Sequence, residues 1–364
     1  MAKQLTAFDE ESAAEALLTA RATDGLPVVI PTPERVERMV AASGLGPDVS
    51  LGRVPPLNGE ATIEKLAINA VMAGCRPAYF PVVVAAAKAM LQPDFNLGQV
   101  QGRTGATGPM LIVNGPIRHE LDIACGIGCI GPGWHANATI GRAMRLILIN
   151  IGGGRVADGD NATLGSPVKF SFCFGENEED SPWQPYHTSR GFQATDSVVT
   201  VLAVESTQSA GMPVRSAPGE RGPSPDAFVN TLAAGIVAPG GAAFSLARAP
   251  AAKGTFVTIV LGPPAARTFQ EQGWTRERLQ QEVWERAAIP VRERKKYAVM
   301  LAGEPEEWEL DPEWDDPDVV LQAFDAPSDI QIVVAGTGSN MVIPNSPWKI
   351  GAPCSELVRP TTAV

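Results

Sequence analysis

Apolar residues recur at helical spacing in several parts of the chain. After the prolines at 55 and 56, five of them share one face: Ile63, Leu66, Ala67, Ala70 and Val71. This spacing predicts a helix with one buried side, capped by Asn58 and ended by Gly74. A second helix begins at Pro33, with Thr32 as its N-cap. Further helices are predicted at about 78–92, 137–150, 225–236, 263–270 and 276–288.

Short apolar runs bounded by glycine, proline or polar residues predict strands. These runs lie at 27–31, 110–113, 168–174, 197–204, 255–261 and 330–335. Because strands alternate with helices, the chain is predicted to be an α/β protein with mixed, partly parallel sheets that carry helices on their faces. We expect an N-terminal arm over 1–25, a first α/β half over 26–195 and a second over 196–364. The acidic stretch 304–318 is expected to be a surface excursion.

Composition and charge narrow the class of protein. The 364 residues are 45% hydrophobic and 19% charged, which is ordinary for a globular protein. A formal net charge of −11 argues against a nucleic-acid partner. No signal-peptide pattern and no apolar run long enough to span a bilayer is present, and the five cysteines make no disulfide framework. We expect a cytoplasmic homo-oligomer that acts on a small molecule, with neither a membrane nor a nucleic acid as partner.

A first polar cluster lies on the helix predicted after residue 58. Glu64, Lys65 and Asn69 place a carboxylate, an ammonium and an amide close together, since Lys65 and Asn69 lie four residues apart. Such groups can bind and polarise a substrate, and the alternative is a solvated helix face. Cys75, beside Arg76, is a candidate nucleophile with a lowered thiol pKa. A helix C-terminus disfavours a thiolate, so simple packing of a small side chain is the alternative for Cys75.

A second cluster is the glycine-rich segment 126–133, which contains the spacing GxGxxG before a helix. Residues 132–135 separate the glycines from that helix, which argues against a nicotinamide site. Backbone N–H groups here can hold a carboxylate or a phosphate, with these polar residues nearby: Asn137, Arg142 and Arg145. Cys125, Cys129 and His135 are the alternative, a zinc site, but a second cysteine pair is lacking. The sequence therefore requires no cofactor, and a divalent metal stays a minority alternative.

A third cluster follows the strand predicted at 168–174. Strand-to-loop junctions in α/β sheets are where ligands bind. Glu176 and Glu178 are candidates for a general base or for hard-metal ligands, with His187 as partner and Arg190 near them. The alternative is an acidic surface turn.

Five segments together resemble the large domain associated with the UGSC (seleno)protein family. They are GEATIEK at 59–65, NAVMAGCRP at 69–77, VNGPIR at 113–118, GPGWHANATIGRA at 131–143 and ENEEDSPW at 176–183. In that family a separate or fused small domain carries a Sec/Cys-Gly-Ser-Cys motif. The resemblance covers most of residues 50–350, but this chain lacks the motif. It implies that a partner supplies the motif or that this branch works without it.

We therefore expect the stretches near 65, 135 and 178 to form one cleft. The predicted function is an enzyme that acts on a small, anionic organic substrate by acid/base chemistry of the lyase, hydratase or hydrolase type. The catalytic candidates are Glu64, Lys65, Glu176, Glu178, His187 and Cys75. The substrate-binding candidates are Asn69, Asn114, Arg118, Asn137, Arg142 and Arg190. Two alternatives stay open: a thiol-dependent or redox subunit that uses Cys75 or Cys173 with a Cys-Gly-Ser-Cys partner, and a non-catalytic scaffold subunit.

Overall fold

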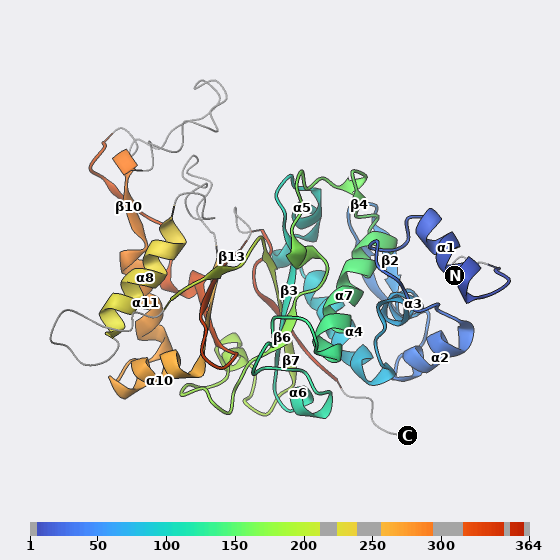
Figure 1. Ribbon diagram of the computed structural model, residues 1–364, viewed down its shortest axis with the longest axis horizontal. Coiled ribbons are helices and arrows are strands. Elements are labelled where there is room, and N and C mark those ends of the chain that lie inside the picture. The colour runs from blue at the N-terminus through green and yellow to red at the C-terminus, as the bar shows by residue number, and fades with distance from the viewer. Residues whose placement is uncertain (1–5, 212–223, 239–255, 294–315, 346–349, 360–364) are drawn as a thin grey trace. The chain divides into compact units, whose positions relative to one another are not determined.

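The computed structural model describes residues 6–211, 224–238, 256–293, 316–345 and 350–359. The chain divides into two compact units (Figure 1). Unit 1 comprises residues 1–176, 185–204 and 351–364, and unit 2 comprises 177–184 and 205–350. This division differs from the predicted halves, because the segment 198–204 and the C-terminal strand belong to unit 1, as does the N-terminal arm.

Unit 1 is built on a sheet with the strand order β14-β7-β3-β6 among the described residues. Strands β3 (Gly108–Asn114) and β6 (Cys173–Gly175) run parallel. Strand β7 (Val198–Val204) is antiparallel to β3, and β14 (Cys354–Leu357) is antiparallel to β7. Every residue of β3 and β7 is buried. Such fully buried central strands are typical of a sheet covered on both faces.

Helices pack on this sheet in unit 1. Helix α4 (Phe80–Met90) contacts β7 and β14, and α7 (His135–Asn150) contacts β3 and β6 (Figure 1). Helix α3 (Ile63–Ala73) packs between α2 (Pro33–Ala41) and α7. The remaining named elements of the unit are α1 (Glu10–Thr19), the hairpin β1 (Ser50–Val54) and β2 (Gly59–Thr62), α5 (Leu97–Gly102), α6 (Ile117–Glu120), β4 (Arg155–Val156) and β5 (Gly159–Asp160).

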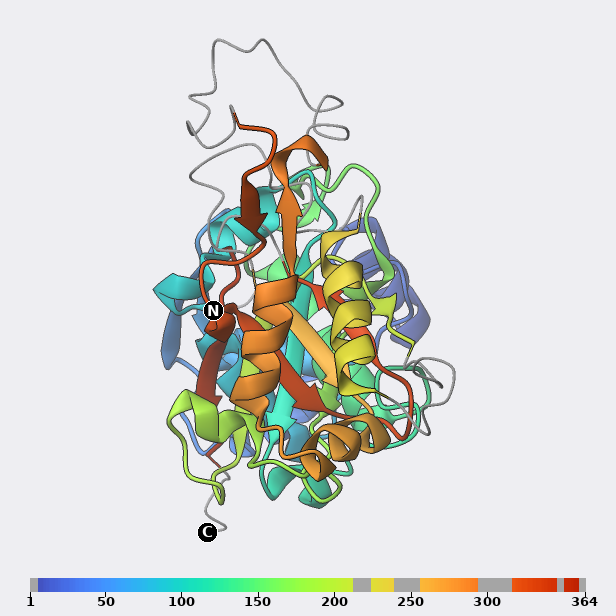
Figure 2. The same cartoon turned by 90° about the vertical axis from the view of Figure 1, so that its left-hand side faces the viewer.

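Unit 2 has a sheet of its own with the order β12-β9-β13-β8 among the described residues. Strands β9 (Val257–Leu261) and β12 (Ile330–Val334) are parallel, whereas β13 (Met341–Pro344) and β8 (Gln208–Ser209) are antiparallel to their neighbours. Helices α8 (Pro225–Val237) and α11 (Arg276–Arg286) lie side by side over these strands, in yellow and orange in Figure 2. Helix α10 (Pro263–Glu271) precedes α11, and a short hairpin of β10 (Ala288–Pro290) and β11 (Val320–Gln322) follows.

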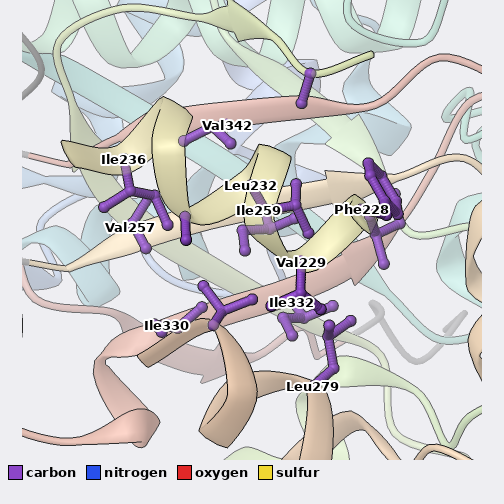
Figure 3. Packing of buried hydrophobic residues seen from close by; sticks show 14 of the residues in the cluster. Phe228, Val229, Leu232, Ile236, Val257, Ile259, Leu279, Ile330, Ile332 and Val342 are labelled. Carbon is purple, nitrogen blue, oxygen red and sulfur yellow. The ribbon is translucent and has the colours of Figure 1, made fainter. Parts of the chain in front are cut away.

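The core of unit 2 lies between these helices and the sheet (Figure 3). Phe228 and Leu232 of α8 and Leu279 of α11 pack with Ile259 and Ile332 of the central strands, and each is exposed by 2% or less. The helices thus cover one apolar sheet face, as expected for a helix-on-sheet layer.

The two sheets share one pattern of strand directions. In each, two parallel strands are joined through helices, and the next strand of the chain returns antiparallel beside the first of them. The fourth strand of each sheet follows the other unit in the chain. Strand β8 comes directly after β7 of unit 1 but pairs with β13 in unit 2, and β14 comes directly after β13 of unit 2 but pairs with β7 in unit 1. Neither unit is therefore a continuous piece of the chain, which is why a single boundary near residue 195 does not describe the division.

Most predicted elements are confirmed. The strands at β3, β7, β9 and β12 are present, and so are the helices α3, α4, α7, α8, α10 and α11. Thr32 caps α2 through a hydrogen bond that its side chain accepts from the Arg35 N–H. Gly74 ends α3 in the left-handed conformation. The α/β class with mixed sheets is therefore correct.

Three local predictions are wrong. Residues 27–31 form no strand; the prolines at both ends lack N–H groups for a ladder. Asn58 does not cap α3 but lies in the β1–β2 turn with φ 57°, and Thr62 is the cap. The strand predicted at 168–174 begins only at Cys173, after a 3-10 turn over Pro167–Lys169. Residues 304–315 of the acidic stretch lie outside the described part of the chain.

In the described ranges, no helix is long and apolar enough to cross a membrane.

Candidate functional site

Unit 1 contains a cavity of about 630 Å³ beside the C-terminal half of α7. Its wall comes from the segments 18–25, 145–149 and 155–170. Four basic side chains line it, and two acidic ones: Arg21, Arg145, Arg155 and Lys169, with Asp24 and Asp160. The volume falls in the range of roughly 300–1,000 Å³ that small-molecule sites occupy. This cavity is therefore the candidate site.

A glycine turn places the segment 155–170 against α7. The helix ends at Asn150, and the chain then reverses through Gly152, Gly153 and Gly154. Gly153 has φ 74°, and a side chain on Gly154 would overlap the Gln101 carboxamide. Only glycine meets both conditions without strain. The turn brings β4, β5 and the following loop back beside Arg145 on the last turns of α7.

Asp160 joins two buried cations in this wall. Its Oδ2 accepts a hydrogen bond of 2.8 Å from Arg145, and its Oδ1 accepts one of 2.7 Å from Lys169 Nζ. The side chains of Arg145, Asp160 and Lys169 are exposed by only 9%, 3% and 12%. In the described part of the chain, neither cation pairs with a second carboxylate. This triad, Arg145–Asp160–Lys169, therefore holds one positive charge in excess at a cavity wall, where an uncompensated charge is costly.

The triad shifts the pKa of two of its members. Burial raises the pKa of Asp160, but the hydrogen bond and charge of Lys169, together with the charge of Arg145, lower it more, to below 3.8. Burial is also the largest effect on Lys169 and lowers its pKa below 10.5, although the hydrogen bond from Lys169 to Asp160 opposes this shift. Asp160 is thus ionised at neutral pH, and Lys169 releases its proton more readily than a lysine in water.

Arg142, which was predicted to bind substrate, is already occupied. Its Nε and NH2 groups both donate 2.8 Å hydrogen bonds to the Asp24 carboxylate, and NH2 also donates to the Pro27 carbonyl at 2.8 Å. Such a bidentate pair is strong and geometrically fixed. Arg142 therefore holds the segment 24–27 on α7, and its charge is balanced by Asp24.

A second polar cluster lies at the carboxyl ends of β3 and β6. Glu176 is fully buried, and its Oε2 accepts hydrogen bonds of 2.6 Å from Asn114 Nδ2 and from the Tyr186 N–H. Arg118 donates to the Glu176 carbonyl at 2.5 Å and to the Gly115 carbonyl at 3.1 Å. The structure thus brings together three predicted residues, Asn114, Arg118 and Glu176. These hydrogen bonds join the end of β3 to the segment that follows β6.

His187 and Arg190 follow in the same unit. His187 is fully buried, and its Nε2 lies 2.8 Å from the Gln193 carbonyl. Arg190 donates a 2.5 Å hydrogen bond to the carbonyl of Pro353, the residue directly before β14. Both contacts connect loops of unit 1 to one another.

The first predicted cluster also makes structural contacts. Lys65 Nζ donates to the Glu60 carbonyl at 3.0 Å, and Glu64 is half-buried. Asn69 is buried; it donates to the Lys65 carbonyl and accepts a 2.8 Å hydrogen bond from Asn150. The Asn69 amide therefore joins α3 to the end of α7.

Asn137 secures the glycine-rich segment. Its Oδ1 accepts a hydrogen bond from the Ala124 N–H, and its Nδ2 donates to the carbonyls of Ala124 and Cys129. All three partners are backbone groups of the loop before α7, so Asn137 holds that loop on the helix. Among the residues that the structure describes, no group of three or more His, Cys, Asp or Glu side chains is arranged to hold a metal ion.

Glu178 belongs to unit 2. Its neighbour Asn177 donates from its backbone N–H to the Val334 carbonyl at 2.7 Å, which extends the sheet of that unit beside β12. The predicted cleft near 65, 135 and 178 thus draws on both units, and it stays a prediction.

The cysteines are free but poorly suited to nucleophilic chemistry. Cys75 is buried, its Sγ donates to the Thr139 carbonyl at 3.3 Å, and burial raises its pKa to about 12. Burial also raises the pKa of Cys173, and that of Cys354 to about 11. Since the thiolate is the reactive form, these three thiols are expected to be inert at neutral pH.

This leads to a first prediction. In the native protein at pH 7.5, iodoacetamide should leave Cys75 unmodified over hours, whereas the half-buried Cys125 should be modified sooner. Peptide mass spectrometry after timed quenching gives both rates, and the same chain in denaturant is the control for full reactivity. Rapid modification of native Cys75 would restore the thiol hypothesis.

Sequence reasoning missed the centre of the cavity. Asp160 and Lys169 were not among the candidates, and Arg145 was noted only as a neighbour of the glycine-rich segment. One signal was available: three consecutive glycines at 152–154 after a helix whose last turns, Leu146–Ile149, are apolar, followed by Asp158 and Asp160. Comparisons of the chain with protein-family models, with curated proteins and with solved structures found no match.

Proposed function

We propose that the chain is an enzyme that binds a small organic anion in the cavity of unit 1 and acts on it by acid/base chemistry. One observation carries the proposal: the buried triad Arg145–Asp160–Lys169 keeps one positive charge in excess on the wall of a cavity of about 630 Å³. A bound carboxylate would neutralise that charge. Arg21 and Arg155 add positive charge along the same wall, although the chain has a net charge of −11.

The three residues of the triad take different roles in this proposal. Arg145 binds the anionic group of the substrate, because a guanidinium matches a carboxylate in geometry. Lys169, whose pKa is lowered by burial, acts as the general acid and donates the proton of its ammonium group to the substrate. Asp160 fixes the position of both cations. Proton donation next to a carboxylate favours a lyase or hydratase reaction, and a hydrolase is the alternative.

A pair of lysine variants tests this proposal. Lys169→Met should weaken binding of a small carboxylate such as propionate, measured by isothermal titration calorimetry or NMR titration, by about 10- to 100-fold. Without the Lys169 ammonium the triad has no excess positive charge for the carboxylate to neutralise, a loss comparable to one charge-assisted hydrogen bond of roughly 1.5–3 kcal/mol. Lys65→Met is the matched control, since that ammonium contacts the Glu60 carbonyl outside the cavity. Loss of binding in Lys65→Met but not in Lys169→Met would instead favour the site predicted near residue 65.

We also propose a family, a partner, a localisation and an oligomeric state for the protein. Membership of the UGSC family stays a prediction, and with it a partner that supplies the Cys-Gly-Ser-Cys motif. We further propose a cytoplasmic homo-oligomer, which size-exclusion chromatography with light scattering would test. The raised pKa values of Cys75 and Cys173 support acid/base chemistry over a thiol mechanism in this chain.

A further inference from the structure

Apolar side chains line the cavity of unit 1 together with the charged ones. Four large apolar side chains that line it are strongly exposed: Leu18 by 50%, Val156 by 66%, Leu164 by 96% and Phe170 by 48%. A single exposed apolar residue is ordinary, but several gathered at one cavity indicate a binding surface.

The triad and these apolar side chains differ in their exposure to solvent. The triad is buried, with side-chain exposures of 12% or less. The apolar side chains have about half or more of their surface open to solvent. They also come from the same short segments, since Phe170 directly follows Lys169 and Val156 directly follows Arg155. Ile149, one helical turn beyond Arg145 on α7, adds a buried apolar residue to the lining.

We infer that the ligand is an amphipathic monoanion, a carboxylate that carries an apolar chain or ring. This inference rests on the proposed function, because it places the carboxylate at the triad. The one excess positive charge of the triad calls for one carboxylate at that place. The exposed Arg21 and the half-buried Arg155 on the same lining are screened by solvent and need no second anionic group, which favours a monoanion over a dicarboxylate. The carbon chain then lies along Val156, Leu164 and Phe170 and removes their apolar surface from water.

A series of straight-chain carboxylates tests the inference. Acetate, butyrate, hexanoate and octanoate are titrated into the full chain by isothermal titration calorimetry. Affinity should rise about three- to fourfold for each added methylene, which is the factor that corresponds to roughly 0.8 kcal/mol per buried CH₂. Hexylamine, with a comparable chain and the opposite charge, should not bind.

Variants separate the apolar part from the charged part. Leu164→Ser and Phe170→Ser should reduce the gain per methylene while leaving the affinity for acetate unchanged. Ile127→Ser is the matched control, since Ile127 is 72% exposed but does not line the cavity. It should leave the whole series unchanged.

The outcomes distinguish the inference from the proposed function. If acetate and octanoate bind equally well and both depend on Lys169, the amphipathic ligand is wrong and the anion site stands. If hexanol binds as tightly as hexanoate and Lys169→Met changes neither, the proposed function fails and an apolar site is left. If light scattering shows self-association that Leu164→Ser abolishes, and octanoate does not compete with it, the apolar side chains serve an interface between copies and the inference is overturned.

Discussion

Replacing Asp160 by alanine is expected to lower the free energy of unfolding by about 3–5 kcal/mol, the usual effect of removing one partner from a buried ion pair. The carboxylate lies between Arg145 and Lys169 and hydrogen-bonds to both. Without it, two buried cations would face each other with no anion between them. Urea unfolding followed by circular dichroism measures the change.

Two further variants check the cause. Adding Lys169→Met to Asp160→Ala removes one of the two cations and should restore part of the lost stability. Asp158→Ala removes an exposed carboxylate two residues away and should change stability by less than about 0.5 kcal/mol. An Asp160→Ala variant as stable as Asp158→Ala would mean that water screens the charges of the triad. The cavity wall would then hold no excess positive charge that needs an anionic ligand.

The pH dependence of this effect has a definite sign. Since the folded-state pKa of Asp160 lies below 3.8, its contribution to stability is fully present above that pH and is lost as pH falls through the lower folded value. The difference in stability between the wild type and Asp160→Asn should therefore shrink in acid. Lys169 affects the stability of the protein at alkaline pH. Its folded-state pKa lies below 10.5, so between the two values the unfolded chain binds more protons and stability rises with pH.

Local signals in the sequence were sufficient to predict most of the fold. Thr32 before Pro33 set the start of α2, and Gly74 set the end of α3, because each acts through bonds within a few residues. The mostly apolar runs of β3 and β12 were short and bounded by turn residues, which was sufficient to predict buried strands. Where two local signals competed, prediction failed: Asn58 and Thr62 are both good caps, and the hairpin of β1 and β2 decided for Thr62.

Features that depend on distant parts of the chain were not predictable in this way. The exchange of β8 and β14 between the units leaves no trace in hydrophobic periodicity, because a short edge strand looks the same in either sheet. Asp160 and Lys169 are ordinary charged residues in a glycine-rich loop and a predicted strand. They become a site only because the turn at 152–154 brings them to Arg145. Arg142, one turn earlier on α7, looked equivalent to Arg145 but pairs with Asp24 from the N-terminal arm.

Gly115→Ala is expected to cost about 4 kcal/mol or more of unfolding free energy, a loss that marks a specific steric cause. Gly115 joins β3 to α6 with φ 84°, and a Cβ there would overlap the Asp196 carbonyl and approach Ser197 Cα to 2.8 Å. Both obstacles are backbone, so neither can rotate away.

Gly191→Ala is the matched control. Gly191 has φ 90° and open space around it, so this variant should lose only the roughly 1–2 kcal/mol of left-handed strain. Equal losses in the two variants, measured by urea unfolding, would show that β3 and the segment at 196–197 move apart freely. The close approach that seats Asn114 and Arg118 around Glu176 would then contribute little to the fold.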